Sequence, residues 1–115
     1  MALAVESARE GKVVVLKLAG SLDASSVDKL SNTIREQATA NNPPLVVLAM
    51  DSLDFISSAG WSVLVESSRS LQEMHGDLRL TNMRDTAQRI FKLMGLEICL
   101  RQYGSVNEAV KSYAE

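Results

Sequence analysis

Two adjacent serines, Ser57 and Ser58, are the residues of this chain whose type and position could support chemistry. They lie in the segment Phe55-Ile-Ser-Ser-Ala-Gly-Trp61, between an apolar strand-like run and a helix-like run. Serine is a preferred N-cap, because its hydroxyl accepts a hydrogen bond from a free N–H of the first helical turn. A serine hydroxyl can equally carry a phosphoryl group. The residues alone leave capping and phosphorylation open as two interpretations of this pair.

The rest of the sequence offers little for an enzyme active site. The single histidine, His75, lies at the far end of the helix that Ser58 begins, about 25 Å away at a rise of 1.5 Å per residue. That separation excludes a Ser-His-acid triad within this chain. There is no GxSxG elbow, no phosphate-binding loop and no Cys/His cluster for zinc, and Asp51 and Asp54 are interpreted as capping or solvated acids. We expect a protein that is not an enzyme and needs no cofactor or metal.

Composition and charge exclude some classes of binding partner. The chain has 115 residues, 46 % of them hydrophobic, and a net charge of -2 without a densely basic stretch, so nucleic acid is not expected as a partner. Cys99 is the only cysteine, and its apolar neighbours predict a buried, inert thiol. The first residues do not resemble a signal peptide, and no apolar run is long enough to span a membrane. We therefore expect a cytoplasmic protein that does not insert into membranes.

Hydrophobic periodicity predicts strands and helices in the order β-β-α-β-α-β-α-β-α. The expected strands cover residues 3–7, 13–20, 45–50, 77–82 and 97–103. The expected helices lie within 21–42, 58–74, 84–96 and 105–115. Strands that alternate with helices require a mostly parallel or mixed sheet with helices packed on it. We expect one α/β domain over residues 1–115.

Turn and cap residues mark the ends of these elements. Asp23 or Ser25 is expected to cap the first helix, and Gly76 to end the second in the left-handed conformation. Ser105 and Glu108 form a capping box at the start of the last helix. The third helix is expected to bury an apolar stripe that runs from Ala87 through Ile90 and Phe91 to Met94.

Two short motifs occur at defined places in this order. Gly20-Ser-Leu-Asp23 follows the second strand, and Phe55-Ile-Ser-Ser-Ala-Gly60 opens the second helix. Each is weak alone, but both occur in register with the same order of elements over nearly the whole chain. The chain therefore resembles the STAS family, the bacterial anti-sigma-factor antagonists. The resemblance implies the STAS fold, an α/β domain with a mixed sheet of about five strands and four helices packed on it.

The resemblance also implies a site. Members of the family are switched by phosphorylation of a serine at the start of the second helix. With Gly60 placed on the glycine of the family pattern Asp-Ser-Ser-Gly, Ser58 falls on the phosphorylated serine, and Ser57 is the fallback acceptor. Ser57 replaces the aspartate of the pattern and Ala59 its second serine. The implied partner-binding residues are Asp23, Ser57, Ser58, Ala59, Gly60 and Trp61.

Trp61 departs from the family pattern, which generally has a smaller aliphatic residue there. Two alternatives remain open from the sequence. The ring packs into the core, or it is a partly exposed anchor in the partner interface, a role in which tryptophan is enriched.

The family implies partners as well. The unphosphorylated chain would bind an anti-sigma factor with serine-kinase activity and free a sigma factor, and a PP2C-type phosphatase would reverse the modification. One alternative is a STAS adaptor subunit of an ABC-type lipid-transport complex without phospho-switching. A nucleotide-binding STAS domain lacks support because there is no phosphate loop. A phosphoreceiver domain is disfavoured because Asp23 stands alone where such domains need an acidic pair.

Overall fold

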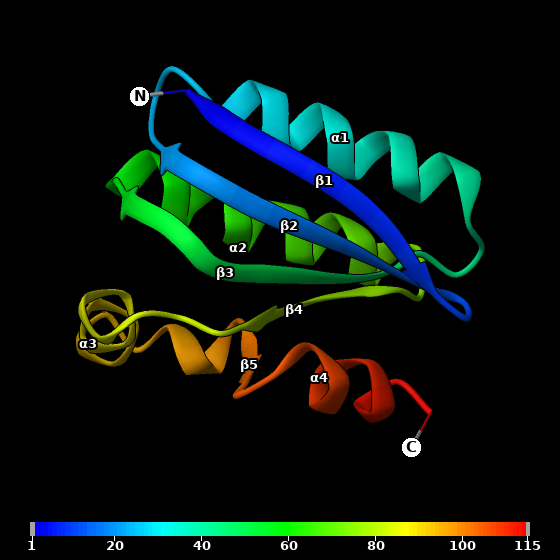
Figure 1. Cartoon of the computed structure of the whole chain (residues 1–115). Coiled ribbons are helices and arrows are strands. Elements are labelled where there is room, and N and C mark those ends of the chain that lie inside the picture. Colours follow the sequence, from blue (N-terminus) through cyan, green and yellow to red (C-terminus); the bar gives the residue numbers. More distant parts are fainter. Residues whose placement is uncertain (1, 115) are drawn as a thin grey trace.

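Five strands lie side by side in the order β1-β2-β3-β4-β5 in the computed structural model, which describes residues 2–114 (Figure 1). β1 and β2 form an antiparallel hairpin, and the other neighbouring strands run parallel. The expected mixed sheet is therefore confirmed. The strands are β1 (Leu3–Glu10), β2 (Val13–Leu22), β3 (Leu45–Ile56), β4 (Asp77–Thr81) and β5 (Arg101–Tyr103).

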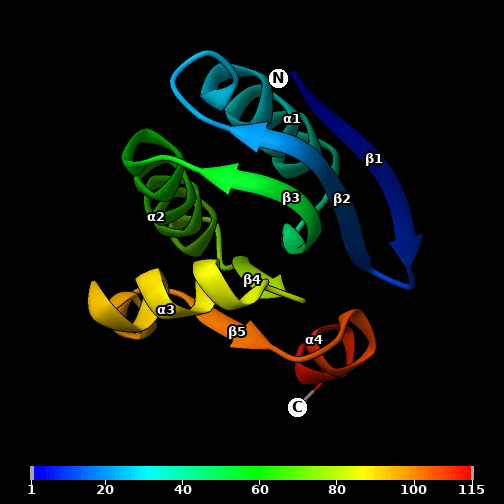
Figure 2. The same cartoon turned by 60° about the vertical axis from the view of Figure 1, so that its left-hand side comes forward.

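Four α-helices cover the two faces of this sheet unequally. α1, α2 and α3 pack on one face and α4 on the other (Figure 2). Successive side chains of a strand point to opposite faces, so Val14 and Leu16 enter the larger core and Val13 and Val15 the smaller one beneath α4. The helices are α1 (Val27–Ala40), α2 (Ser58–Glu73), α3 (Asp85–Leu93) and α4 (Val106–Ser112).

All five strands differ in length from the prediction, and the largest differences are in β3 and the fifth strand. β3 continues past Met50 to Ile56, because the end of β2 pairs with it through two register shifts. The fifth strand begins only at Arg101 and not at residue 97. Residues Leu96–Ile98 instead form the short 3-10 helix η1, whose first carbonyl accepts hydrogen bonds from the N–H groups of Cys99 and Leu100.

The predicted helix ends were correct only in part. Ser105 caps α4 and accepts a hydrogen bond from the Glu108 N–H, as expected, at 3.1 Å. Gly76, however, is not left-handed; His75 takes that conformation with φ 64°. Gly76 is needed for another reason, because a Cβ there would collide with the carbonyl oxygen of Pro44.

The start of the first helix and the environment of Cys99 were also predicted wrongly. α1 begins after Ser26, because the Asp23 carbonyl accepts the N–H groups of Ser26 and Val27 and closes a turn before the helix. Cys99 is exposed and not buried, since it follows η1 at the surface rather than lying in a strand.

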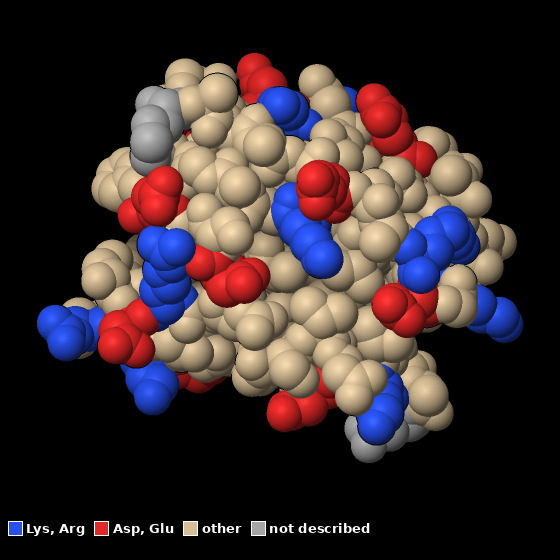
Figure 3. All heavy atoms as spheres, viewed as in Figure 1, with Lys and Arg blue, Asp and Glu red and all other residues tan. Residues whose placement is uncertain are grey.

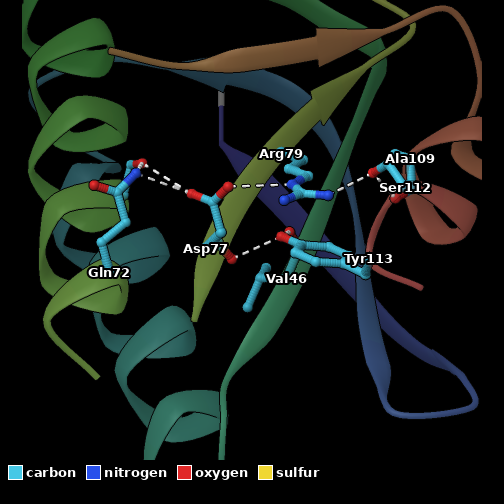
Figure 4. A network of polar contacts seen from close by, with 8 residues as sticks. Val46, Gln72, Asp77, Arg79, Ala109, Ser112 and Tyr113 are labelled. Carbon is cyan, nitrogen blue, oxygen red and sulfur yellow. Dashed lines mark hydrogen bonds and ion pairs between the residues drawn. The ribbon is translucent and has the colours of Figure 1, made fainter. Parts of the chain in front are cut away.

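A polar network fixes α4 to the sheet (Figure 4). The Tyr113 hydroxyl lies 2.8 Å from the carbonyl oxygens of both Val46 and Asp77. The Arg79 guanidinium lies over the Tyr113 ring at 3.9 Å, pairs with the Asp77 carboxylate at 3.1 Å and donates to the Ser112 hydroxyl at 2.6 Å. Burial raises the pKa of the Tyr113 hydroxyl above its ordinary value, so this hydroxyl stays a donor.

Charged side chains of both signs are interspersed over the face seen in Figure 3.

Among residues 2–114, none of the helices combines the length and the apolar character that crossing a bilayer requires.

Candidate functional site

The two sequence motifs meet where β2 ends and α2 begins. The Ser57 N–H donates a hydrogen bond to the Leu22 carbonyl oxygen at 2.9 Å. A Cβ on Gly60 would lie 2.7 Å from that same oxygen and 3.0 Å from the side chain of Ile56. Only glycine therefore allows the first turn of α2 to approach the end of β2 this closely. The close approach brings Asp23 and the serine pair into one region of the surface.

The two serines of the pair do different things. Ser57 is the N-cap of α2, and its hydroxyl accepts a hydrogen bond from the Gly60 N–H at 3.2 Å. Ser58 is the first residue of the helix, is exposed, and its hydroxyl makes no hydrogen bond with residues 2–114. Capping chemistry thus accounts for Ser57 and leaves Ser58 without a structural role.

Asp23 lies half-buried in the turn between β2 and α1. Its carboxylate accepts hydrogen bonds from the Ser25 hydroxyl at 2.6 Å and from the Ser25 backbone N–H at 3.0 Å. These bonds favour the charged form and hold the pKa of the Asp23 carboxyl below its usual value. Asp23 is therefore a fixed negative charge beside the start of α2.

Trp61 is buried, with 3 % of its surface exposed. Its ring centroid lies 6.1 Å from that of Phe91 in α3, in a tilted arrangement. Of the two alternatives that the sequence left open, the structure shows the core one, so Trp61 supports the site from within. Of the other residues of the segment, Ala59 is half-buried and Gly60 is buried.

A shallow groove, with a volume of about 320 Å³, runs along α2 from Ser58. α2 contributes residues at helical spacing, among them Ser62, Val65 and Arg69, and Met94 and Leu96 form the opposite wall. Met94 was expected to be buried, but it lies beyond the end of α3 and is 54 % exposed. Leu93, which precedes Met94 in the chain, is exposed as well.

Sequence reasoning missed these groove residues. The spacing of Ser58, Ser62 and Arg69 along one helix was a usable signal, since residues three and four apart share a face. The opposite wall depends on where the chain turns after α3, at Gly95 with φ 65°; the sequence predicts that Gly95 ends this helix, but it predicts a strand from residue 97 in place of η1.

The start of α2 can accept an anion. A helix N-terminus carries a partial positive charge and free N–H groups that bind phosphate oxygens. The first turn of α2 itself contains no acidic residue, whereas the Asp23 carboxylate nearby is a like charge for a phosphate on Ser58. Among residues 2–114, no three His, Cys, Asp or Glu side chains are close enough to share a metal ion.

Comparison with known proteins bears on this arrangement. The STAS domain family pattern matches residues 4–109. RsfB from Mycobacterium tuberculosis, an anti-sigma-F factor antagonist, is 24 % identical over 108 residues, which are 94 % of this chain and 87 % of RsfB.

Solved structures agree in fold. An anti-sigma factor antagonist from Mycobacterium paratuberculosis superposes with a TM-score of 0.86 at 18 % identity, covering 98 % of this chain and 95 % of that one. The unphosphorylated form of the anti-sigma factor antagonist SpoIIAA gives a TM-score of 0.78 at 22 % identity, covering 96 % of each chain.

The fold, with a helix that begins at Ser58, is that of a small α/β domain with the architecture of these antagonists. Because the family pattern covers most of the sequence, the chain belongs to the STAS domain family.

Proposed function

We propose that this STAS domain is an anti-sigma-factor antagonist that acts as a phosphorylation-controlled protein-binding switch. Ser58 carries the proposal: it is exposed, its hydroxyl is unbonded among residues 2–114, and it lies at the end of an open groove. The names of the relatives support the same function. The domain, taken as residues 1–115, acts in the cytoplasm as a binding protein and not as an enzyme.

The unphosphorylated form binds an anti-sigma factor with serine-kinase activity and frees a sigma factor. The kinase transfers a phosphoryl group to Ser58, and a PP2C-type phosphatase removes it. Ser57 is the poorer acceptor, because its hydroxyl is engaged with the Gly60 N–H. The neighbouring surface formed by Asp23, Ser57 and Ala59 contacts the partner, and the buried Gly60 and Trp61 hold the start of α2 in place.

Charge explains how one modification blocks binding. The phosphate adds about -1.5 to -2 charges at neutral pH. The helix N-terminus tolerates this anion, so the fold stays intact and the effect falls on the docking surface. An unmatched charge buried in an interface costs several kcal/mol, or roughly 10³-fold in affinity. That loss is enough for an on/off switch.

Calorimetric titration with the anti-sigma factor of the same organism tests this function. We expect tight binding of the unmodified chain, and a loss of about tenfold or more in affinity for Ser58→Asp. Ser70→Asp is the matched control, because Ser70 is exposed on the same helix but lines the groove between α1 and α2 instead. The control variant should bind like the unmodified chain.

The alternative function, an adaptor subunit of an ABC-type lipid-transport complex, predicts the opposite results. In that case the anti-sigma factor does not bind, and Ser58→Asp has no more effect than Ser70→Asp.

A further inference from the structure

A second hollow, which Trp61 also lines, lies between the end of β3 and α3. It has a volume of about 230 Å³. It exists because β4 pairs with β3 only as far as Ala49, after which β3 continues alone on that side to Ile56. The apolar walls come from β3 and α3, and include Met50, Leu53, Ile56, Ala87 and Ile90.

Two hydrogen-bond donors at this cavity lack a full set of partners. Trp61 is one of the residues that line the cavity, and its buried indole N–H has no acceptor among residues 2–114. A buried donor without an acceptor costs free energy, and such groups are rare in folded proteins. At the rim, the Arg84 guanidinium donates to the Asp51 carbonyl at 2.8 Å and to the Asp54 carboxylate at 3.3 Å. No hydrogen bond from its remaining terminal nitrogen to residues 2–114 is seen.

The charges at the rim cancel. Arg84 and Asp54 form an ion pair whose side chains are about half exposed, and both line the cavity. A carboxylate ligand would compete with Asp54 for Arg84, and a cationic ligand would compete with Arg84 for Asp54. The site therefore favours an uncharged molecule that offers an acceptor to the two donors.

Volume sets the size of that molecule. An apolar cavity of about 150 Å³ accommodates benzene, and sites for drug-sized ligands span about 300–1,000 Å³. A cavity between these sizes fits one ring with a short substituent. We propose that the cavity between β3 and α3 is a binding site for a small neutral aromatic molecule that carries a carbonyl oxygen. Ile56 and Trp61 flank the serine pair in the chain, so the bound molecule lies against the start of α2.

Nuclear magnetic resonance of the ¹⁵N-labelled chain tests the site without any partner or kinase. Trp61 is the only tryptophan, so its indole N–H gives one resolved signal. The probe is acetophenone, which is neutral and has a carbonyl oxygen. Ethylbenzene has the same size without an acceptor, and benzoate carries a charge. We expect acetophenone to cause a saturable shift of the indole signal and of the backbone signals of Ala87 and Ile90. Ethylbenzene and benzoate should bind about tenfold more weakly.

Two variants with the same chemical change locate the binding. Ala87→Leu fills the cavity and should abolish the saturable shifts. Ala40→Leu adds the same atoms at the exposed end of α1 and should leave the saturable shifts unchanged. If Ala87→Leu fails to fold, Ala87→Val takes its place.

Three results would overturn the inference. The first is the absence of saturable shifts with acetophenone up to its solubility limit. The second is equal binding by the Ala87 variant. The third, equal binding of all three probes, contradicts the proposed ligand class. None of these results depends on whether Ser58 is phosphorylated, so the inference and the proposed switch fail separately.

Discussion

The Ser57 N–H and the Leu22 carbonyl oxygen are joined by a hydrogen bond of 2.9 Å, which connects the two motifs of the sequence across 35 residues of chain. The same oxygen leaves room for glycine alone at position 60. Because of this contact, the turn that holds Asp23 and the helix that begins at Ser58 form one surface.

Gly60→Ala should destabilise the fold, because its Cβ would lie 2.7 Å from the Leu22 oxygen and force β2 and α2 apart. We expect a loss of about 1–3 kcal/mol in the free energy of unfolding, measured by urea denaturation. Gly104→Ala is the matched control, since the nearest atoms to its Cβ are carboxylate oxygens at 3.9 Å. Equal stability of the two variants would contradict the close contact.

Ser57→Ala and Ser58→Ala should differ in stability. Ser57→Ala removes the cap of α2 and should lower the free energy of unfolding by about 0.5–2 kcal/mol. Ser58→Ala removes an exposed, unbonded hydroxyl and should stay within about 0.5 kcal/mol of the unmodified chain. Denaturation of both variants under the same conditions measures the difference. The reverse order would mean that Ser58 is the true cap.

Trp61→Ala should lower the free energy of unfolding by about 3–5 kcal/mol, because it leaves a cavity beside Phe91 in the core. Trp61→Phe keeps an aromatic ring and removes the indole N–H that has no acceptor among residues 2–114, so it should cost clearly less. Thermal and urea denaturation measure both losses. If Trp61→Ala were as stable as the unmodified chain, the ring would not belong to the core.

Sequence reasoning recovered the order of the strands and helices, but not all of the residues at which they begin and end. β-branched and helical patterns are local, so they predicted five strands and four α-helices in the correct order. The extension of β3 to Ile56 depends on pairing with β2, and the loss of the first half of the fifth strand depends on the turn at Gly95. The first is a non-local pairing that a periodicity does not contain, whereas the second is a local turn whose apolar residues, Leu96 and Ile98, alternate as in a strand.

In the candidate site, too, some features could be predicted from the sequence and others needed the structure. The motif glycine and the two serines could be read from the sequence, because capping and close approach restrict the residue type locally. The different roles of Ser57 and Ser58, and the burial of Trp61, follow from contacts with Gly60 and Phe91 that only the structure supplies.

Tyr113→Phe should loosen the attachment of α4, since the hydroxyl lies 2.8 Å from two backbone oxygens in the described part of the chain. The free energy of unfolding should fall by about 1–2 kcal/mol near neutral pH. Tyr103→Phe is the control, because no hydrogen bond from the Tyr103 hydroxyl is seen among residues 2–114.

The difference in stability between the unmodified chain and Tyr113→Phe should depend on pH. Folding raises the pKa of Tyr113 because the hydroxyl is buried, so the fold favours its neutral form. Its contribution to stability is complete below the unfolded pKa of about 10 and is lost as the pH rises above it. The stability difference between the unmodified chain and Tyr113→Phe should therefore shrink from about pH 8 to about pH 11. A difference that grows with pH would contradict the buried neutral hydroxyl.

The most direct test of the switch is the intact mass of the chain after incubation with ATP, magnesium and the anti-sigma kinase of its own organism. We predict a gain of one phosphate, about 80 Da, in the unmodified chain and in Ser57→Ala, and no gain in Ser58→Ala. A gain in Ser58→Ala that Ser57→Ala loses would move the acceptor to Ser57. The absence of any gain, with a kinase shown to be active on another substrate, would contradict phosphorylation control of this domain.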